Sequence, residues 1–220
     1  MSRLGNVLIL GDSYSTFEGY IPEGYDVWYC RQNYEGHYTD VCDVAQTWWA
    51  QLFERTDATL TLNCSWSGTT VCHTGFTGDC SHKSFVSRFD KLVSEGFFEQ
   101  HPVDTVFVFG GTNDAWANSP LGENMTADWK KEDLFSFLPA IFYLNHRLKT
   151  TLPNARIVCI LNSDLPEAIV RGTKEACRTF RTEAVELTNI SKQTGHPDVK
   201  GMKQIAEQLL VHLEKTAPDT

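Results

Sequence analysis

The chain of 220 residues contains 19 basic and 28 acidic residues, a formal net charge of −9, and 41% of its residues are hydrophobic. This acidic balance, without a basic stripe, argues against nucleic acid or an anionic membrane surface as a main partner. The length suits one α/β domain over residues 1–220, with enough apolar surface to bury a stable core. No apolar stretch approaches the ~20 residues that a membrane-spanning helix requires.

The first predicted element is a buried strand over residues 6–10, where four apolar residues follow one another. A segment of about residues 14–44 comes next and holds many aromatic residues and glycines without a sustained period. Long irregular inserts in compact domains are usually functional or disordered, and the aromatic content argues against disorder. We expect these rings either to form a lid or wall beside a cleft or to pack a small extra core.

Strands and helices alternate through the rest of the chain. In order, we predict a helix over 45–56, a strand over 59–65 that lies nearer an edge, a helix over 81–97 closing at Gly96, and a strand over 104–110. A helix over 129–153 follows, kinked or broken at Pro139, then a strand over 156–161, a helix over 167–185 interrupted near Gly172, and a helix over 199–216. This alternation predicts an α/β fold, a three-layer α/β/α sandwich with a mainly parallel central sheet.

The seven cysteines show neither a C-x-x-C pair nor histidine partners at zinc-binding spacing. We therefore predict buried free thiols rather than a metal site or a disulfide framework. The first apolar run begins too early for a secretory leader to precede it. We expect a cytoplasmic protein, or a secreted or periplasmic one whose leader was removed before this numbering begins.

Small and polar residues follow the ends of the predicted strands. Gly11-Asp12-Ser13 comes directly after the first strand, and the next three are followed by "NCSWSGTT" (63–70), "GGTND" (110–114) and "NSDL" (162–165). A further polar stretch, "TGHPDVKG" (194–201), precedes the last helix. Because ligands bind at the carboxyl ends of parallel strands, a serine, glycines, an asparagine and a histidine should meet at one edge. Acyl transfer needs this set: a nucleophile, oxyanion donors and a base.

The blocks "GDSYS", "NCSWSGTT", "GGTND" and "GHPDVKGM" together resemble the four sequence blocks of the SGNH (GDSL-type) hydrolase superfamily. They occur in the order of that family and extend the resemblance from residue 7 to about residue 210. The resemblance implies a flavodoxin-like α/β/α fold and the activity of an esterase, lipase, thioesterase or carbohydrate deacetylase. It also implies a small-molecule ester as the binding partner, with no metal or organic cofactor.

Four residues of this sequence occupy the family's functional positions. The resemblance implies Ser13 as the nucleophile and His196 as the general base, with an oxyanion hole built from the Ser13 and Gly68 backbone N–H groups and the Asn113 amide. A serine hydroxyl is a poor nucleophile until a base removes its proton, and an imidazole with a pKa near ~6.5 can do so. The oxyanion donors then stabilise the tetrahedral intermediate, and a glycine allows the backbone to approach it closely.

The last block departs from the family pattern, in which an aspartate three residues before the histidine orients the imidazole. Gln193 stands at that position. A glutamine can accept a hydrogen bond from Nδ1–H, but it carries no charge to stabilise an imidazolium. Three explanations remain open. Ser13 and His196 work as a dyad with a backbone carbonyl or Gln193 as the orienting group, or Asp164 or Asp198 supplies the carboxylate, or the protein is a non-catalytic relative.

Two functions from different classes are compatible with these residues. The first is a serine hydrolase that cleaves a carboxylic ester, with a small acyl group on a polar carrier such as a carbohydrate. The insert favours that substrate because it is rich in Tyr, Trp and Gly and poor in Leu and Ile. The alternative is a catalytically weak or inactive module of the same fold that binds a carbohydrate or acyl ligand. In both cases we expect Asp12 to brace its loop and Asp114 to cap a helix.

Overall fold

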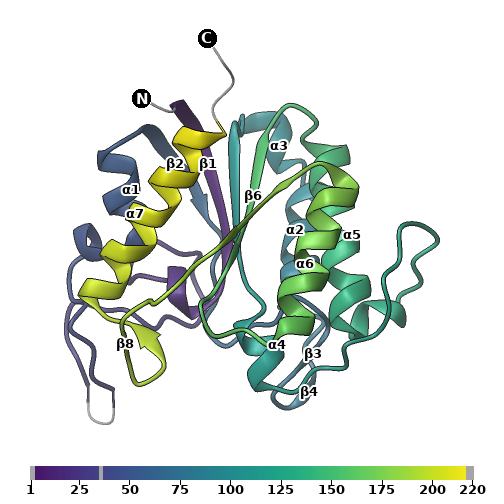
Figure 1. Ribbon diagram of the computed structural model, residues 1–220, viewed down its shortest axis with the longest axis horizontal. Helices are drawn as coiled ribbons and strands as arrows, with labels where there is room; N and C mark the ends of the chain where they lie inside the picture. The colour runs from purple at the N-terminus through teal and green to yellow at the C-terminus, as the bar shows by residue number, and fades with distance from the viewer. Residues whose placement is uncertain (1–2, 35–36, 217–220) are drawn as a thin grey trace.

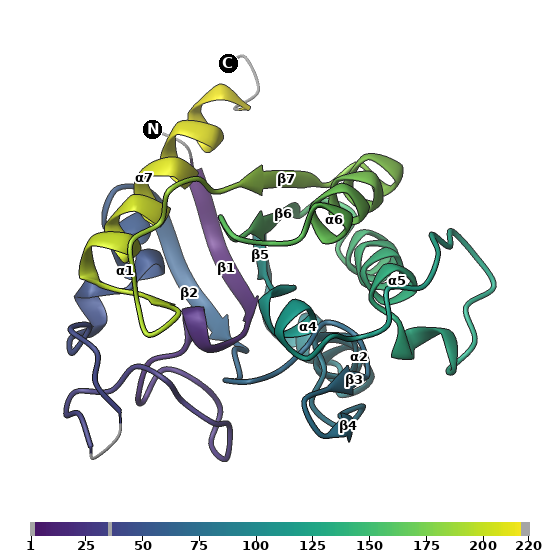
Figure 2. The same cartoon turned by 60° about the horizontal axis from the view of Figure 1, so that its bottom comes forward.

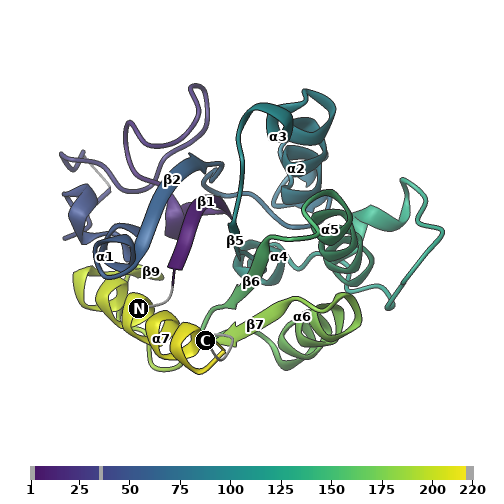
Figure 3. The same ribbon diagram turned by 90° about the horizontal axis from the view of Figure 1, so that it is seen from above.

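A parallel five-stranded sheet runs through the middle of the computed structural model, which describes residues 3–34 and 37–216. The strands lie in the order β2-β1-β5-β6-β7 (Figure 3), and each neighbouring pair is parallel. Their bounds are β1 Arg3–Gly11, β2 Asp57–Asn63, β5 Thr105–Phe109, β6 Arg156–Leu161 and β7 Glu183–Glu186. The predicted parallel sheet is confirmed, and β2 lies at an edge, as its more alternating pattern indicated.

Helices cover both faces of this sheet, α1 and α7 on one face and α2, α5 and α6 on the other (Figure 1). The helices are α1 Trp48–Glu54, α2 Phe85–Ser94, α3 Phe97–Gln100, α4 Thr112–Trp116, α5 Phe137–Thr151, α6 Glu167–Phe180 and α7 Val199–Lys215. Short 3₁₀ helices are η1 Ser13–Ser15, η2 Val44–Gln46 and η3 Asp133–Phe135. Two small hairpins pair β3 Thr74–Gly75 with β4 Gly78–Asp79, and β8 Lys192–Gln193 with β9 His196–Pro197.

The apolar run of β1 supplies side chains to both hydrophobic cores, because successive residues of a strand point to opposite faces. Val7 and Ile9 belong to the core on the α1 and α7 side, and Leu8 and Leu10 to the core on the α2, α5 and α6 side. A strand that is buried on both faces has a continuous apolar sequence rather than an alternating one. The predicted three-layer α/β/α sandwich is thus confirmed, with β1 inside the sheet between β2 and β5.

The helix predicted over 129–153 begins later than expected, and Pro139 does not break it. The 3₁₀ helix η3 comes first, and α5 starts at Phe137, so Pro139 lies in the first turn. The N–H groups of a first turn have no acceptor within the helix, so a proline there loses no helical hydrogen bond.

The helix predicted over 167–185 is wrong in two respects. First, α6 continues through Gly172, where a Cβ would lie 2.1 Å from the Leu138 side chain, so the glycine allows α5 and α6 to pack closely. Second, α6 ends at Phe180, and Arg181 with a φ of 55° turns the chain into the edge strand β7. This strand, Glu-Ala-Val-Glu, lies at the edge of the sheet, where short strands with charged residues are common. It therefore contains no apolar run by which the sequence could reveal it.

The strand order reverses beside β1, since the chain passes from β1 out to β2 and returns to β5 on the other side of β1. Ligands of open parallel sheets bind at the carboxyl ends of the strands at such a reversal. Figure 2 brings this edge of the sheet toward the viewer, with α4 following β5. Within residues 3–34 and 37–216, no helix is long and apolar enough to cross a membrane.

Candidate active site

Ser13 lies at the turn where β1 ends and the 3₁₀ helix η1 begins. The carboxylate of Asp12 accepts the backbone N–H of Tyr14 at 3.0 Å, so it braces this turn as expected. A Cβ at Gly11 would lie 2.6 Å from the Ser65 Oγ, so glycine is needed where β1 passes the loop after β2. Burial raises the pKa of Asp12 to about 7.

His196 reaches Ser13 from the β8–β9 hairpin, 183 residues further along the chain. The imidazole Nε2 lies 2.9 Å from the Ser13 Oγ, within hydrogen-bond distance. Two tyrosine hydroxyls hold the hairpin in place by donating to backbone carbonyls on either side of the histidine. Tyr14 donates to Gly195 at 2.6 Å, and Tyr29 donates to Pro197 at 2.7 Å. The insert and the 3₁₀ helix therefore position the imidazole from opposite sides.

A backbone carbonyl faces the other nitrogen of the imidazole ring. The Nδ1 of His196 lies 3.2 Å from the carbonyl oxygen of Thr194, which accepts the hydrogen bond when Nδ1 carries the proton. Thr194 and Gly195 form the two-residue turn of the hairpin and both have positive φ angles, of 48° and 79°. Gln193 pairs with His196 through the backbone ladder, but its side chain is exposed and makes no hydrogen bond to the ring among the described residues.

The two candidate carboxylates are engaged elsewhere. Asp164 forms an ion pair with Lys192. Asp198 is the N-cap of α7, where it accepts the Gly201 N–H at 2.7 Å and the Ser191 hydroxyl at 2.7 Å. Of the three explanations for the missing acid, the geometry corresponds to a serine–histidine pair oriented by a backbone carbonyl.

The imidazole lies in a dry and aromatic environment. The indole of Trp28 stacks on it with ring centroids 3.5 Å apart and planes 10° from parallel. Tyr14 and Trp116 pack more steeply against the same ring, at 5.3 and 5.9 Å. The pKa of His196 is lowered to about 4, chiefly by burial; the hydrogen bond to Thr194 opposes the shift, and the neighbouring His37 and Lys192 add to it.

The predicted oxyanion donors lie on the loops after β1 and β2 and in the helix α4, and these segments are tied together by hydrogen bonds. The backbone N–H of Trp66 donates to the Gly11 carbonyl at 3.1 Å and so connects the loop after β2 to the loop that carries Ser13. In that loop Gly68 has a φ of 72°, and the space where a Cβ would lie is open. Asn113, in the first turn of α4, donates one amide N–H to the Thr69 carbonyl at 2.9 Å, which leaves its second N–H for a ligand.

Arg88 was not among the residues that the sequence singled out, although it lies under these loops. Its buried guanidinium donates to the Gly11 carbonyl at 3.0 Å, to the Thr69 hydroxyl at 3.0 Å and to the Cys64 carbonyl. It thereby joins the ends of β1 and β2. A signal existed, because an arginine within the apolar face of the 81–97 helix, next to Phe89, has to find partners when buried.

Asp114 does not cap a helix, contrary to expectation. It lies inside α4, and Gly111 is the residue that precedes the helix. Its carboxylate accepts the backbone N–H groups of Val71 and Cys72 at 2.9 and 3.1 Å, so it ties α4 to the loop that carries Gly68. Burial raises the pKa of Asp114 to about 6.

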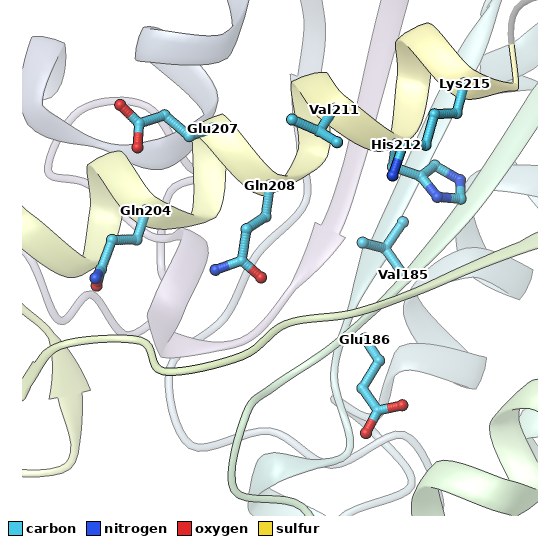
Figure 4. Close-up of a pocket in the computed structure, with 8 residues that line it drawn as sticks. All are labelled: Val185, Glu186, Gln204, Glu207, Gln208, Val211, His212 and Lys215. Carbon is cyan, nitrogen blue, oxygen red and sulfur yellow. The ribbon is translucent and has the colours of Figure 1, made fainter.

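A cavity of about 180 Å³ lies next to the hairpin that carries His196, with Gly195 and the His196-contacting Trp116 in its lining. Its lining combines hydroxyl, amide, ammonium and carboxylate groups with one aromatic wall, from Thr112, Ala115, Trp116, Asn162, Asp164, Leu165, Lys192 and Gly195. A larger cavity, of about 370 Å³, lies between β7 and α7 (Figure 4). None of its lining residues belongs to the loops of the site, whereas Gly195, the neighbour of His196, lines the smaller cavity.

The sheet order and the loops at its carboxyl edge define an α/β protein with the SGNH hydrolase fold. The chain belongs to the GDSL-like lipase/acylhydrolase family, whose model matches residues 5–213. It is therefore a hydrolase by family and fold.

Solved structures agree with this assignment. A protein from Bacteroides ovatus described as a GDSL-like lipase is 41% identical, with a TM-score of 0.89, and the match covers 98% of this chain and 100% of that one. A similarly described protein from Bacteroides uniformis is 40% identical, with a TM-score of 0.87, covering 97% and 96%. An acetyl xylan esterase from Butyrivibrio proteoclasticus shares the fold at 19% identity, with a TM-score of 0.61, covering 97% of this chain and 64% of that one. No curated protein matches the chain.

Proposed function

We propose that this protein is a carboxylic ester hydrolase in which Ser13 is the nucleophile and His196 the general base. The observation that carries the proposal is the 2.9 Å contact between the Ser13 Oγ and the His196 Nε2. As the hydroxyl attacks the ester carbonyl, Nε2 takes its proton and then returns it to the leaving alcohol. A water molecule, activated in the same way, releases the acid and regenerates the serine.

The oxyanion of the tetrahedral intermediate would be held by the Ser13 and Gly68 backbone N–H groups and the Asn113 amide. Among the described residues, neither backbone N–H donates to another protein group, so both are free to receive the developing charge. Such donors are worth on the order of 10²–10³ in kcat when they are already oriented. Arg88 and Asp114 support this role by fixing the two loops to each other.

The substrate we propose carries a small acyl group on a polar alcohol such as a carbohydrate. The cavity beside His196 is small, and its hydroxyl, amide and charged groups can form hydrogen bonds with the hydroxyls of a leaving alcohol. Trp116, 47% exposed at its rim, offers a ring face for a sugar. A long aliphatic chain would need a continuous apolar groove, which this lining does not provide.

The test is the hydrolysis of p-nitrophenyl acetate by wild type, Ser13→Ala and the surface control Ser94→Ala. We expect Ser13→Ala to lose the activity by a factor of ~10³ or more with an unchanged circular dichroism spectrum, and Ser94→Ala to match wild type. A fluorophosphonate probe should label wild type and the control but not Ser13→Ala. Equal rates in wild type and Ser13→Ala would contradict the proposal, and an unlabelled wild type would favour a binding module.

The substrate class is tested with the same wild-type protein. We expect it to release acetate from an acetylated monosaccharide and to hydrolyse p-nitrophenyl palmitate far more slowly than the acetate ester. The reverse preference would contradict a small acyl group, without bearing on the role of Ser13.

A further inference from the structure

The indole of Trp28 and the imidazole of His196 form the closest ring pair described at the site. Their centroids are 3.5 Å apart and their planes differ by 10°, so one face of the imidazole is covered by the indole. Trp28 comes from the 14–44 insert and is anchored by its backbone N–H, which donates to the Thr16 Oγ1 at 2.9 Å. His37 packs against the indole, with centroids 4.4 Å apart at 67°. The insert thus builds a stack of rings that ends on the histidine.

No carboxylate balances a positive charge on this histidine among the described residues. Lys192 and His37 are the neighbouring groups whose charge affects the imidazole, and both act against protonation of His196. The hydroxyls of Ser13 and Tyr14 are neutral.

Three acids on the segments around the site each interact with another group. Asp164 is paired with Lys192, Asp198 caps α7, and Asp12 accepts the backbone N–H of Tyr14. An imidazolium formed in the reaction would therefore have to be stabilised by something other than an anion.

A tryptophan at position 28 has an energetic cost that a phenylalanine at the same position would not have. The indole N–H is buried and finds no acceptor among the described residues. A buried donor left unpaired is destabilising, so a phenylalanine ring would suit the packing better. Tryptophan has the strongest cation-binding face of the aromatic residues, and that face is what His196 contacts.

We propose that Trp28 is the charge partner of His196, and that its indole face stabilises the imidazolium where a catalytic triad would place a carboxylate. The inference rests on the proposed function, in which His196 takes the proton of Ser13. Trp28 does not touch the reacting ester, so it is a positioning residue that acts through the histidine. The Thr194 carbonyl sets the orientation of the ring, and Trp28 supplies the electrostatic contribution.

Site-specific fluorination of the indole tests this electrostatic role. Each fluorine withdraws π density from the face with little change in shape, so log kcat/KM for p-nitrophenyl acetate should fall steadily from one to four fluorines. The total loss expected is roughly 2- to 30-fold, the range of cation–π contributions in desolvated sites. The acid limb of the kcat/KM profile should move to lower pH in the same order, because a weaker partner favours the neutral imidazole.

Trp129 offers a matched control. Its indole N–H is also buried and unpaired, and its ring also contacts a histidine, His146, at 5.2 Å, on the α5 side of the sheet away from the site. Fluorination of Trp129 should leave both kcat/KM and the pH profile unchanged. A flat series at Trp28, or equal slopes at both positions, would overturn the inference.

A simpler variant separates the charge effect from packing. Trp28→Phe keeps an aromatic face, weakens its attraction for a cation and removes the unpaired N–H, so we expect an equal or higher Tm together with a lower kcat. A variant with a lower Tm and an unchanged kcat would overturn the inference. Fluorophosphonate labelling of wild type keeps the two proposals distinct: an unlabelled wild type overturns both, whereas a labelled one with a flat fluorination series overturns only the role of Trp28.

Discussion

At His196, the absence of a neighbouring carboxylate has a measurable consequence for the proton. Burial lowers the pKa of His196 to about 4, and no anion opposes the shift. The imidazole is therefore neutral, and competent to act as a base, over the whole range above about pH 5. The imidazolium that forms during the reaction is correspondingly less stable. Among the described residues, ring contacts and the Thr194 carbonyl are what stabilise it.

The pH dependence of hydrolysis follows from this shift. A histidine with the ordinary pKa of about 6.5 would be ~90% protonated at about pH 5.5, and kcat/KM would fall about tenfold from its plateau. With its pKa lowered to about 4, His196 stays neutral there, so we expect kcat/KM at about pH 5.5 to remain close to its plateau value. Initial rates at low substrate concentration between about pH 3.5 and 8 would measure the acid limb of the kcat/KM profile. A midpoint of that limb near about 6.5 would contradict the prediction.

Thr194 is strained, because a β-branched residue rarely adopts a φ of 48°. Asparagine tolerates this region, and Asn-Gly is the preferred pair in a two-residue hairpin turn with two positive φ angles. We expect Thr194→Asn to raise stability by about 1 kcal/mol and to leave kcat/KM within about twofold, since His196 uses the backbone carbonyl and not the side chain. Denaturant unfolding and kinetics would measure both quantities, and a large loss of activity would mean that the threonine side chain itself takes part.

At the scale of elements, the site depends on how firmly β1 and β2 are joined at their carboxyl ends. Arg88 reaches from α2 to the Gly11 and Cys64 carbonyls and to the Thr69 hydroxyl, so one cation satisfies acceptors on both strand ends. Burial of an arginine without a direct carboxylate partner is costly, and its hydrogen bonds have to compensate. Its charge also lowers the pKa of Asp12, although burial of that carboxyl dominates.

Arg88→Met keeps much of the volume and removes these donors. We expect a destabilisation of about 3 kcal/mol or more, since several buried acceptors lose their partner, and a Tm lower by about 6–12 °C. Arg178→Met, on the exposed side of α6, is the control and should change stability by less than about 0.5 kcal/mol. Thermal unfolding of the two variants, followed by circular dichroism, measures the difference in Tm. Equal Tm values for the two variants would contradict the proposed role of Arg88.

The 14–44 insert does not form the small extra core that was one of its two predicted arrangements, but packs into the main core on the α1 and α7 side of the sheet. Phe17 and Tyr29 are buried in the core, and Tyr29 also holds the histidine hairpin. Trp28 forms a wall against the imidazole. Tyr34 and Tyr38 remain exposed, 60% and 64%, on the same segment. The buried side of the insert thus packs against the core, and the part of the insert next to the β8–β9 hairpin belongs to the site.

At the scale of the whole molecule, the fold buries most of the cysteine thiols, four of them in the core on the α2, α5 and α6 side. All seven cysteines are free, and six of them are buried. We expect Ellman's reagent to titrate about one thiol, Cys42, in the native protein and all seven after unfolding in guanidinium without reductant. A total below seven after unfolding would show that disulfides form, and several rapid thiols in the native state would contradict the burial described.

Local sequence determined the parts of this protein whose signal is contained within a few consecutive residues. The apolar runs of β1, β5 and β6 marked strands buried on both faces, and the four blocks indicated a family and a set of functional residues. The edge strand β7 escaped because it has only four residues and two of them are charged. Pro139 and Gly172 were misjudged, because their effect depends on where a helix starts and on what packs against it.

Only the tertiary structure decided what surrounds His196. Along the sequence a backbone carbonyl, Gln193, Asp164 and Asp198 were all candidates, and none of the three side chains bonds to the ring in the described structure. The Thr194 carbonyl and the face of Trp28 are the groups that contact the ring, and no local sequence pattern marks either of them as a partner of the histidine. A backbone carbonyl is present in every residue, and a stacking partner is defined only when segments 168 residues apart are packed together by the fold.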